Sequence, residues 1–110
     1  MRYVPERGDI VWISLNPQAG HEQAGHRPAL VLSPKAYNAK VGLMLCCPIT
    51  NQAKGYPFEV DLRGDPHVSG VVLADQVKCL DWRARGIRKK GVASRSELGE
   101  TLEKLKTLLE

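Results

Sequence analysis

The sequence lacks the features of a membrane, secreted or metal-binding protein. No apolar run approaches the roughly 20 residues that cross a membrane, and the first residues carry no apolar signal segment. The three cysteines and three histidines show no spacing typical of metal ligands. We therefore expect a cytoplasmic protein that uses no metal or other cofactor and has no membrane partner.

Internal repeats, low-complexity segments and flexible linkers are also absent, so the length of 110 residues favours one domain over residues 1–110. Acidic residues are outnumbered: 12 Asp and Glu stand against 16 Lys and Arg, which gives a formal charge of +4 and a pI of about 9.1. A basic chain suits a polyanionic partner such as RNA, DNA or an acidic protein. The charge alone does not choose among them.

The apolar pattern predicts a mostly β protein with two helices. Strands are expected at residues 10–15, 29–32, 43–49, 58–63, 70–74, 77–80 and 87–93. A short helix is expected over residues 35–40, with Ser33 as its N-cap. Ser94 and Glu97 match a capping box that begins a longer helix. Its apolar stripe, which covers either the domain core or a partner subunit, contains Leu98, Leu102, Leu105 and Leu109.

Two pairs of adjacent residues in the predicted sheet allow further expectations. Cys46 and Cys47 are adjacent in an apolar run, so we expect them on opposite sheet faces as buried free thiols rather than in a disulfide. Asp75 and Gln76 separate two apolar runs, and polar groups are costly to bury there unless they are hydrogen-bonded. This second pair is either a solvent-facing bulge or part of a functional site.

A Gly-rich stretch before the second strand gathers the chemistry-bearing side chains. It reads GHEQAGHRPALVLSP and occupies residues 20–34. His21, Glu22 and His26 offer acid–base groups, while Arg27 offers a fixed cation directly before a proline, which favours an extended backbone. The alternative is a solvated hairpin loop in which Arg27 forms only a structural ion pair.

Four blocks in register resemble the MazF/PemK family of toxin endoribonucleases, and the MazF branch in particular. They are GDIVWISLNP at the start, GHEQAGHRPALVLSP, the stretch from CPIT to KGYPFEV, and GVVLADQVKCLDWRARG. The resemblance implies a mostly β, SH3-like small barrel with short helices and a C-terminal helix. It implies a homodimer and the toxin of a type II toxin–antitoxin pair, with an acidic antitoxin as partner.

The resemblance also implies a reaction: sequence-specific, metal-independent cleavage of single-stranded RNA at a short ACA-like motif. The expected products are a 2′,3′-cyclic phosphate and a 5′-hydroxyl. The family's catalytic positions fall on Arg27 and Thr50, and a histidine implicated in chemistry in the PemK branch falls on His21. The PemK branch has an arginine where this chain has Leu73. Arg27 would therefore stabilise the charge of the phosphate without a second arginine at that position.

These positions receive distinct expected roles. Arg27 would stabilise phosphate charge because its planar fork binds phosphate oxygens in two places. Thr50 would donate one hydrogen bond, His21 would transfer protons, and Glu22 would orient Arg27 or accept a proton. The expected RNA-binding residues are Lys54, Tyr56, Asp75 and Gln76.

Each of these assignments has a simpler alternative. Thr50 can be only a turn residue, and His21 can be a loop residue that touches solvent or RNA without chemistry. The basic stretch of residues 83–90 is either a solvated surface or an attractive surface for RNA or an acidic tail. The alternative function is a non-catalytic SH3-like module that binds nucleic acid or an acidic peptide.

Overall fold

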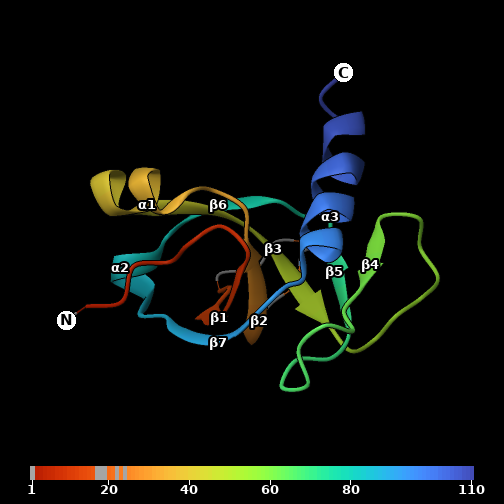
Figure 1. Ribbon diagram of the computed structural model, residues 1–110, viewed down its shortest axis with the longest axis horizontal. Helices are drawn as coiled ribbons and strands as arrows, with labels where there is room; N and C mark the ends of the chain where they lie inside the picture. The colour runs from red at the N-terminus through yellow and green to blue at the C-terminus, as the bar shows by residue number, and fades with distance from the viewer. Residues whose placement is uncertain (1, 17–19, 22, 24) are drawn as a thin grey trace.

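The computed structural model describes residues 2–16, 20, 21, 23 and 25–110 (Figure 1). Each element follows the expected order along the chain, with one short helix added before the last strand. The elements are β1 (Asp9–Ser14), β2 (His26–Val31), α1 (Lys35–Val41), β3 (Leu43–Thr50), β4 (Glu59–Asp61), β5 (Val71–Leu73), β6 (Lys78–Asp81), α2 (Trp82–Arg85), β7 (Arg88–Val92) and α3 (Arg95–Thr107).

The strands form one antiparallel sheet in the order β4-β5-β3-β2-β1-β7, and β6 pairs with the first half of β3. The strand β3 is central, because it pairs with β2 and β6 and its second half also pairs with β5. Over the described residues, β4 and β7 end the path and do not pair, so the sheet is not closed into a barrel. The predicted fold class, mostly β with a C-terminal helix, is confirmed.

Alternating residues of the strands form two apolar clusters on opposite faces of the bent sheet. Val11 and Ile13 lie in one cluster, whereas Ile10 lies in the other. Cys46 and Cys47 divide in the same way, and both are buried free thiols as predicted. The period of two along each strand therefore decides which side chains enter which cluster.

The helix α3 covers the cluster that contains Ile10, at the end of the molecule near β4 and β5 (Figure 1). Its predicted capping box is present, since Ser94 accepts from the backbone N–H of Glu97 and Glu97 accepts from that of Ser94. Leu98, Leu102 and Leu105 pack on the cluster, but Leu109 lies beyond the helix and is 77% exposed. Among the described residues, no helix is long and apolar enough to cross a membrane.

The short helices α1 and α2 are fixed by the buried amide of Asn38. The Asn38 side-chain NH₂ donates to the backbone carbonyls of Pro5 and Ser33. The backbone carbonyl of Asn38 accepts from the indole N–H of Trp82. The prediction of Ser33 as N-cap is wrong, because Pro34 occupies that position without a side-chain cap bond. The Ser33 hydroxyl instead donates to the Asn38 side chain at 2.6 Å, which ties the helix to the strand before it.

Candidate active site and nucleic-acid interface

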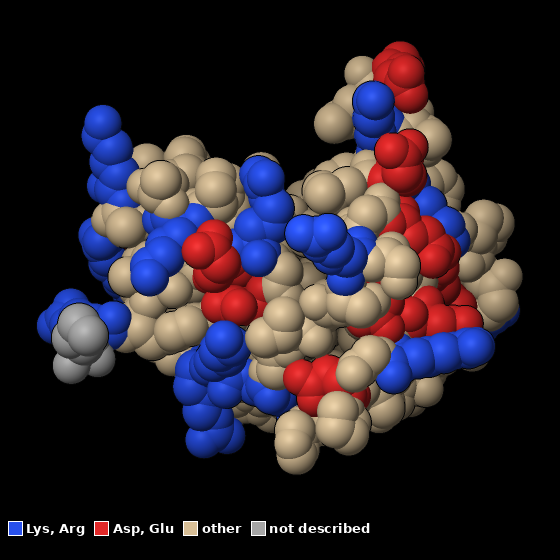
Figure 2. Space-filling view, in the orientation of Figure 1, with Lys and Arg blue, Asp and Glu red and all other residues tan. Residues whose placement is uncertain are grey.

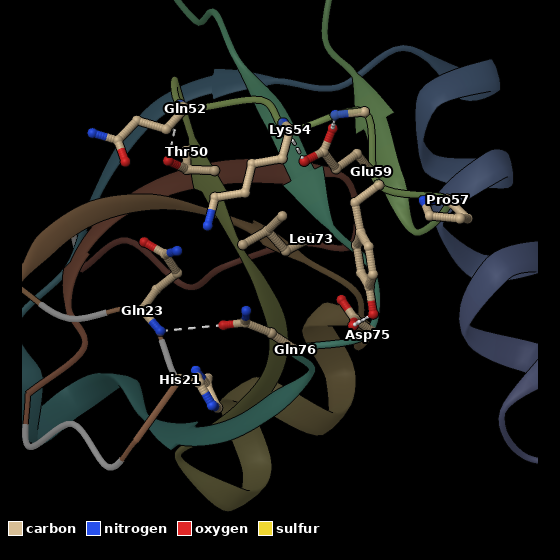
Figure 3. A pocket seen from close by; sticks show the side chains of 12 residues that line it. His21, Gln23, Thr50, Gln52, Lys54, Pro57, Glu59, Leu73, Asp75 and Gln76 are labelled. Carbon is tan, nitrogen blue, oxygen red and sulfur yellow. Dashed lines mark hydrogen bonds between the residues drawn. The ribbon is translucent and has the colours of Figure 1, made fainter.

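Two hollows meet at Thr50, the last residue of β3. The larger, of about 620 Å³, lies between the β1–β2 loop, the 52–57 loop and the β5–β6 turn (Figure 3). The smaller, of about 260 Å³, lies on the other side of Thr50, over β1 and β2. The threonine side chain therefore borders both spaces.

Glycine at position 70 sets the placement of Thr50. Residue 70 has a φ of +110°, and a Cβ there would lie 2.4 Å from the Thr50 carbonyl oxygen. Thr50 itself pairs with Val71 across the sheet, and only 5% of its surface is exposed. Its Oγ1 accepts from the backbone N–H of Gln52 at 3.1 Å, which leaves the hydroxyl its own proton to donate.

The 52–57 loop presents Lys54 and Tyr56 at the larger hollow, and Glu59 holds that loop in shape. The Glu59 carboxylate accepts from the backbone N–H groups of Lys54 at 2.9 Å and Gly55 at 3.1 Å. Gly55 has a φ of +76°, a conformation that other residues adopt reluctantly. In Figure 3 the Lys54 side chain points into the hollow. One carboxylate thus fixes the backbone from which a cation and an aromatic ring project.

The Asp75-Gln76 pair is a turn between β5 and β6 that lines the larger hollow, not a bulge inside one strand. The Tyr56 hydroxyl donates to Asp75 Oδ2 at 2.8 Å, and this bond raises the pKa of Tyr56. Asp75 Oδ1 is buried with no hydrogen-bond partner among the described residues. Gln76 Oε1 accepts from the backbone N–H of Gln23 at 3.2 Å, which joins the turn to the β1–β2 loop.

Arg27 lines the smaller hollow. It lies on β2 opposite Ile13 and is half-buried, while its neighbour His26 is exposed and stacks on Trp12 with ring centroids 6.4 Å apart. His67 also reaches this hollow. The loop that carries His67 is fastened by Asp65, which accepts from the backbone N–H groups of His67 and Val92.

The basic residues between positions 83 and 90 form two groups: one makes contacts within the fold, and the other is exposed on β7. Arg85 donates to the carbonyls of Ser14 and Asn16, and Arg83 lies over the Trp82 ring, so both guanidinium groups serve the fold. The remaining cations are exposed on β7 and are Arg88, Lys89 and Lys90. Figure 2 shows basic side chains over β7 and acidic side chains gathered along α3.

Most of the predicted site residues come together, although they lie far apart in sequence. The larger hollow is lined by His21, Thr50, Lys54, Tyr56, Asp75 and Gln76. Arg27 lies across Thr50 from them, in the second hollow. Glu22 falls outside the residues that the structure describes. Within the described part of the chain, no three His, Cys, Asp or Glu side chains gather closely enough to hold a metal ion.

Sequence reasoning missed three contributors to this region. Glu59 belongs to an alternating strand pattern, which predicts only that its side chain faces solvent. Strand periodicity predicts only that Trp12 belongs to one sheet face, and His67 lies between the third and fourth blocks that carry the family resemblance. A carboxylate that follows a Lys-Gly turn by a few residues is the signal that could have identified Glu59.

A sequence model described as the PemK-like, MazF-like toxin of type II toxin–antitoxin systems matches residues 6–109. The chain therefore belongs to this family. The predicted family and enzyme class are confirmed.

Individual relatives agree over nearly the whole chain. The endoribonuclease toxin MazF of Escherichia coli K12 is 55% identical over 108 residues, covering 98% of this chain and 96% of the relative. The crystal structure of MazF from Deinococcus radiodurans superposes with a TM-score of 0.94 at 56% identity and covers 98% of each chain. A MazE–MazF crystal structure from the same organism superposes with a TM-score of 0.86 at 49% identity, covering 98% of this chain and 97% of the other.

Proposed function

We propose that this toxin-family protein cleaves single-stranded RNA, including mRNA, at a short ACA-like motif, without a metal ion. The observation that carries the proposal is the position of Thr50 between two hollows. A guanidinium lines one of them, and an imidazole and an ammonium group line the other. The family relatives named as endoribonucleases support RNA as the substrate.

The proposed reaction uses the nucleophile that RNA already contains. Attack by the 2′-hydroxyl on the adjacent phosphorus forms the cyclic bond, while the bond to the 5′-oxygen breaks and that oxygen takes a proton. The products are a 2′,3′-cyclic phosphate and a 5′-hydroxyl. A group that removes the first proton and a group that supplies the second are sufficient, and no metal-bound water is required.

The side chains at Thr50 divide this work. Arg27 stabilises the negative charge of the crowded phosphorane, because its planar, cationic guanidinium offers two parallel donors. Thr50 donates its hydroxyl proton to a non-bridging oxygen. His21 is exposed and can reach the larger hollow, where an imidazole suits proton transfer near neutral pH. Glu22 is assigned the orientation of Arg27 or proton acceptance, from its place in the Gly-rich stretch before Arg27.

Side chains of the larger hollow bind the unpaired bases around the cleaved bond. Tyr56 is 47% exposed and offers a ring for stacking, which requires a base that is not inside a duplex. Lys54 holds a neighbouring phosphate. Gln76 contacts a base edge through its side-chain NH₂, because its Oε1 already accepts from Gln23, and Asp75 holds the Tyr56 ring through its hydroxyl.

The same groove explains regulation by an antitoxin. We assign this protein a homodimeric form and an acidic, extended antitoxin segment that covers the groove around Arg27 and Thr50. The MazE–MazF complexes of Deinococcus radiodurans support such a partner. A carboxylate-rich strand presents charge similar to that of RNA, so the two should compete.

Digestion of a long RNA by purified protein, followed by sequencing of the new 5′ ends, tests the proposal. With a chelator present, we expect cuts at a common ACA-like triplet, 5′-hydroxyl ends and no cutting of the same sequence in a duplex. A protein that binds this RNA but leaves it intact would instead be the non-catalytic SH3-like module. Cleavage that stops with chelator would refute the metal-independent reaction.

A further inference from the structure

A third hollow continues the groove beyond Arg27. It has a volume of about 190 Å³ and is lined by Trp12, Arg88, Lys89 and Lys90. Trp12 and Lys90 also line the 260 Å³ hollow that contains Arg27 and Thr50. Shared residues therefore connect all three hollows: Thr50 joins the first to the second, and Trp12 with Lys90 joins the second to the third.

The strand pairing explains why Trp12 stands at this junction. In β1, Trp12 pairs with Pro28 of β2 on one side and with Arg88 of β7 on the other. Proline carries no long side chain that could cover the indole, and Arg88 is exposed. The indole is accordingly only half-buried, unlike that of Trp82, which is 6% exposed and bonded to a backbone carbonyl.

The chemistry of this extension differs from that of the 620 Å³ hollow. Lys90 Nζ lies 5.6 Å from the Trp12 ring centroid, and His26 stacks on the same indole. Of the described residues that line the second and third hollows, none is Asp or Glu, whereas the first hollow contains Glu59 and Asp75. Flat rings beside cations form the usual platform for a single nucleic acid strand.

We propose that Trp12, Lys90 and Arg88 form a second nucleotide-binding site, which holds RNA nucleotides flanking the recognised motif on one side. The proposal rests on the RNA cleavage proposed above. A base stacks in the Trp12–His26 region, Lys90 binds the phosphate between this base and Arg27, and Arg88 binds the phosphate beyond. Lys89 contributes less, because it is paired with Asp9 at 3.5 Å. An acidic peptide would use the cations but would leave the aromatic platform without a role.

The test compares RNAs of two lengths that contain the recovered cleavage motif. Each carries a 2′-deoxy sugar at the attacking position, so that binding is measured without cleavage. One RNA holds the motif with a single flanking nucleotide at each end, and two others extend it by four nucleotides on the 5′ or the 3′ side. Lys90→Gln is compared with Lys106→Gln, an exposed lysine near the end of α3 that serves as the matched control.

The wild-type protein should bind one extended RNA at least about fivefold more tightly than the short RNA, as expected for one stacked base. Lys90→Gln should lose most of this gain, and its affinity for the short RNA should fall less than its affinity for the extended RNA. Lys106→Gln should keep the gain. The extended RNA should also quench tryptophan fluorescence, and Trp12→Phe should remove that quenching if the variant remains folded.

Equal affinity of the wild-type protein for short and extended RNAs would overturn the second site while the cleavage activity still stands. Equal losses in Lys90→Gln and Lys106→Gln would also overturn it, because general charge attraction would then be sufficient. If Lys90→Gln weakens only an acidic inhibitor peptide, the surface is a protein interface instead. Failure to bind or cut any RNA would refute the proposed function together with this site.

Discussion

The carboxylate of Glu59 allows the clearest test of how the 52–57 loop is held. Glu59→Gln keeps the shape of the side chain and one oxygen, but it turns the second oxygen into an NH₂ donor. One of the two backbone N–H groups, of Lys54 or Gly55, then loses its acceptor. A hydrogen bond to a charged acceptor contributes about 1.5–3 kcal/mol, and the lower end applies here because both residues are exposed.

A loss of about 1.4 kcal/mol corresponds to roughly a tenfold change in an equilibrium constant, so the ordered loop should become about tenfold less favoured. Because Lys54 and Tyr56 are proposed to bind RNA rather than to perform the chemistry, the effect should appear mainly as a higher KM. Amide hydrogen exchange at Lys54 and Gly55 should accelerate by a similar factor. The matched control is Glu103→Gln, an exposed carboxylate on α3.

Initial cleavage rates on a fluorogenic RNA, taken over a range of substrate concentrations, separate KM from kcat. Exchange at the two amides is followed in the same preparations. If Glu59→Gln and Glu103→Gln share wild-type KM and wild-type exchange rates, Glu59 does not hold the loop. A loss confined to kcat would instead assign Glu59 to the reaction itself.

Three further predictions concern stability, thiol reactivity and charge. Burial alone would raise the pKa of Glu97, but hydrogen bonds from the backbone of Arg63, Ser94 and Gly64 outweigh it and lower the pKa. Glu97→Gln should therefore reduce the free energy of unfolding by about 1–3 kcal/mol at pH 7 in urea titrations, a difference that should shrink as acid protonates Glu97 below about pH 4. Burial raises the pKa of both Cys46 and Cys47 to about 12, so a thiol reagent at pH 7.5 should label one cysteine, Cys79, in native protein and three after denaturation. Affinity for RNA should fall steeply with salt through counterion release, and a flat salt dependence would contradict an electrostatic groove.

Local sequence signals predicted those parts of the fold that rest on local physics. The Ser94–Glu97 capping box and the alternation at Cys46 and Cys47 depend on neighbours along the chain, and both are present. The Ser33 cap failed because its hydroxyl donates to the Asn38 side chain and accepts from the backbone N–H of Leu45 on β3, a contact that forms only in the folded protein. The helix α2 was not expected, since its four residues depend on the Asp81 side chain, which accepts from the backbone N–H of Ala84.

The site shows the same division. The family resemblance selected Arg27 and Thr50, but no local pattern reveals that Arg27 lies on one side of Thr50 and the larger hollow on the other. That arrangement follows from the bend of β3 between β6 and β5, and from the close approach of Gly70 to the Thr50 carbonyl. Glu59 and Trp12 were overlooked because their roles depend on contacts made after the sheet has formed.

The cleavage rate of Arg27→Ala tests the central claim most directly. Arg63→Ala is the control, because Arg63 is an exposed arginine whose side chain forms a surface ion pair with Asp61 at 3.3 Å. Both proteins are assayed with excess enzyme on one motif-containing RNA, after their thermal unfolding has been shown to match the wild type. Loss of a transition-state contact of about 3 kcal/mol or more should slow Arg27→Ala roughly a hundredfold or more, and Arg63→Ala should cleave normally. Cleavage by folded Arg27→Ala within a few-fold of the wild-type rate would contradict the assignment of phosphate stabilisation to Arg27.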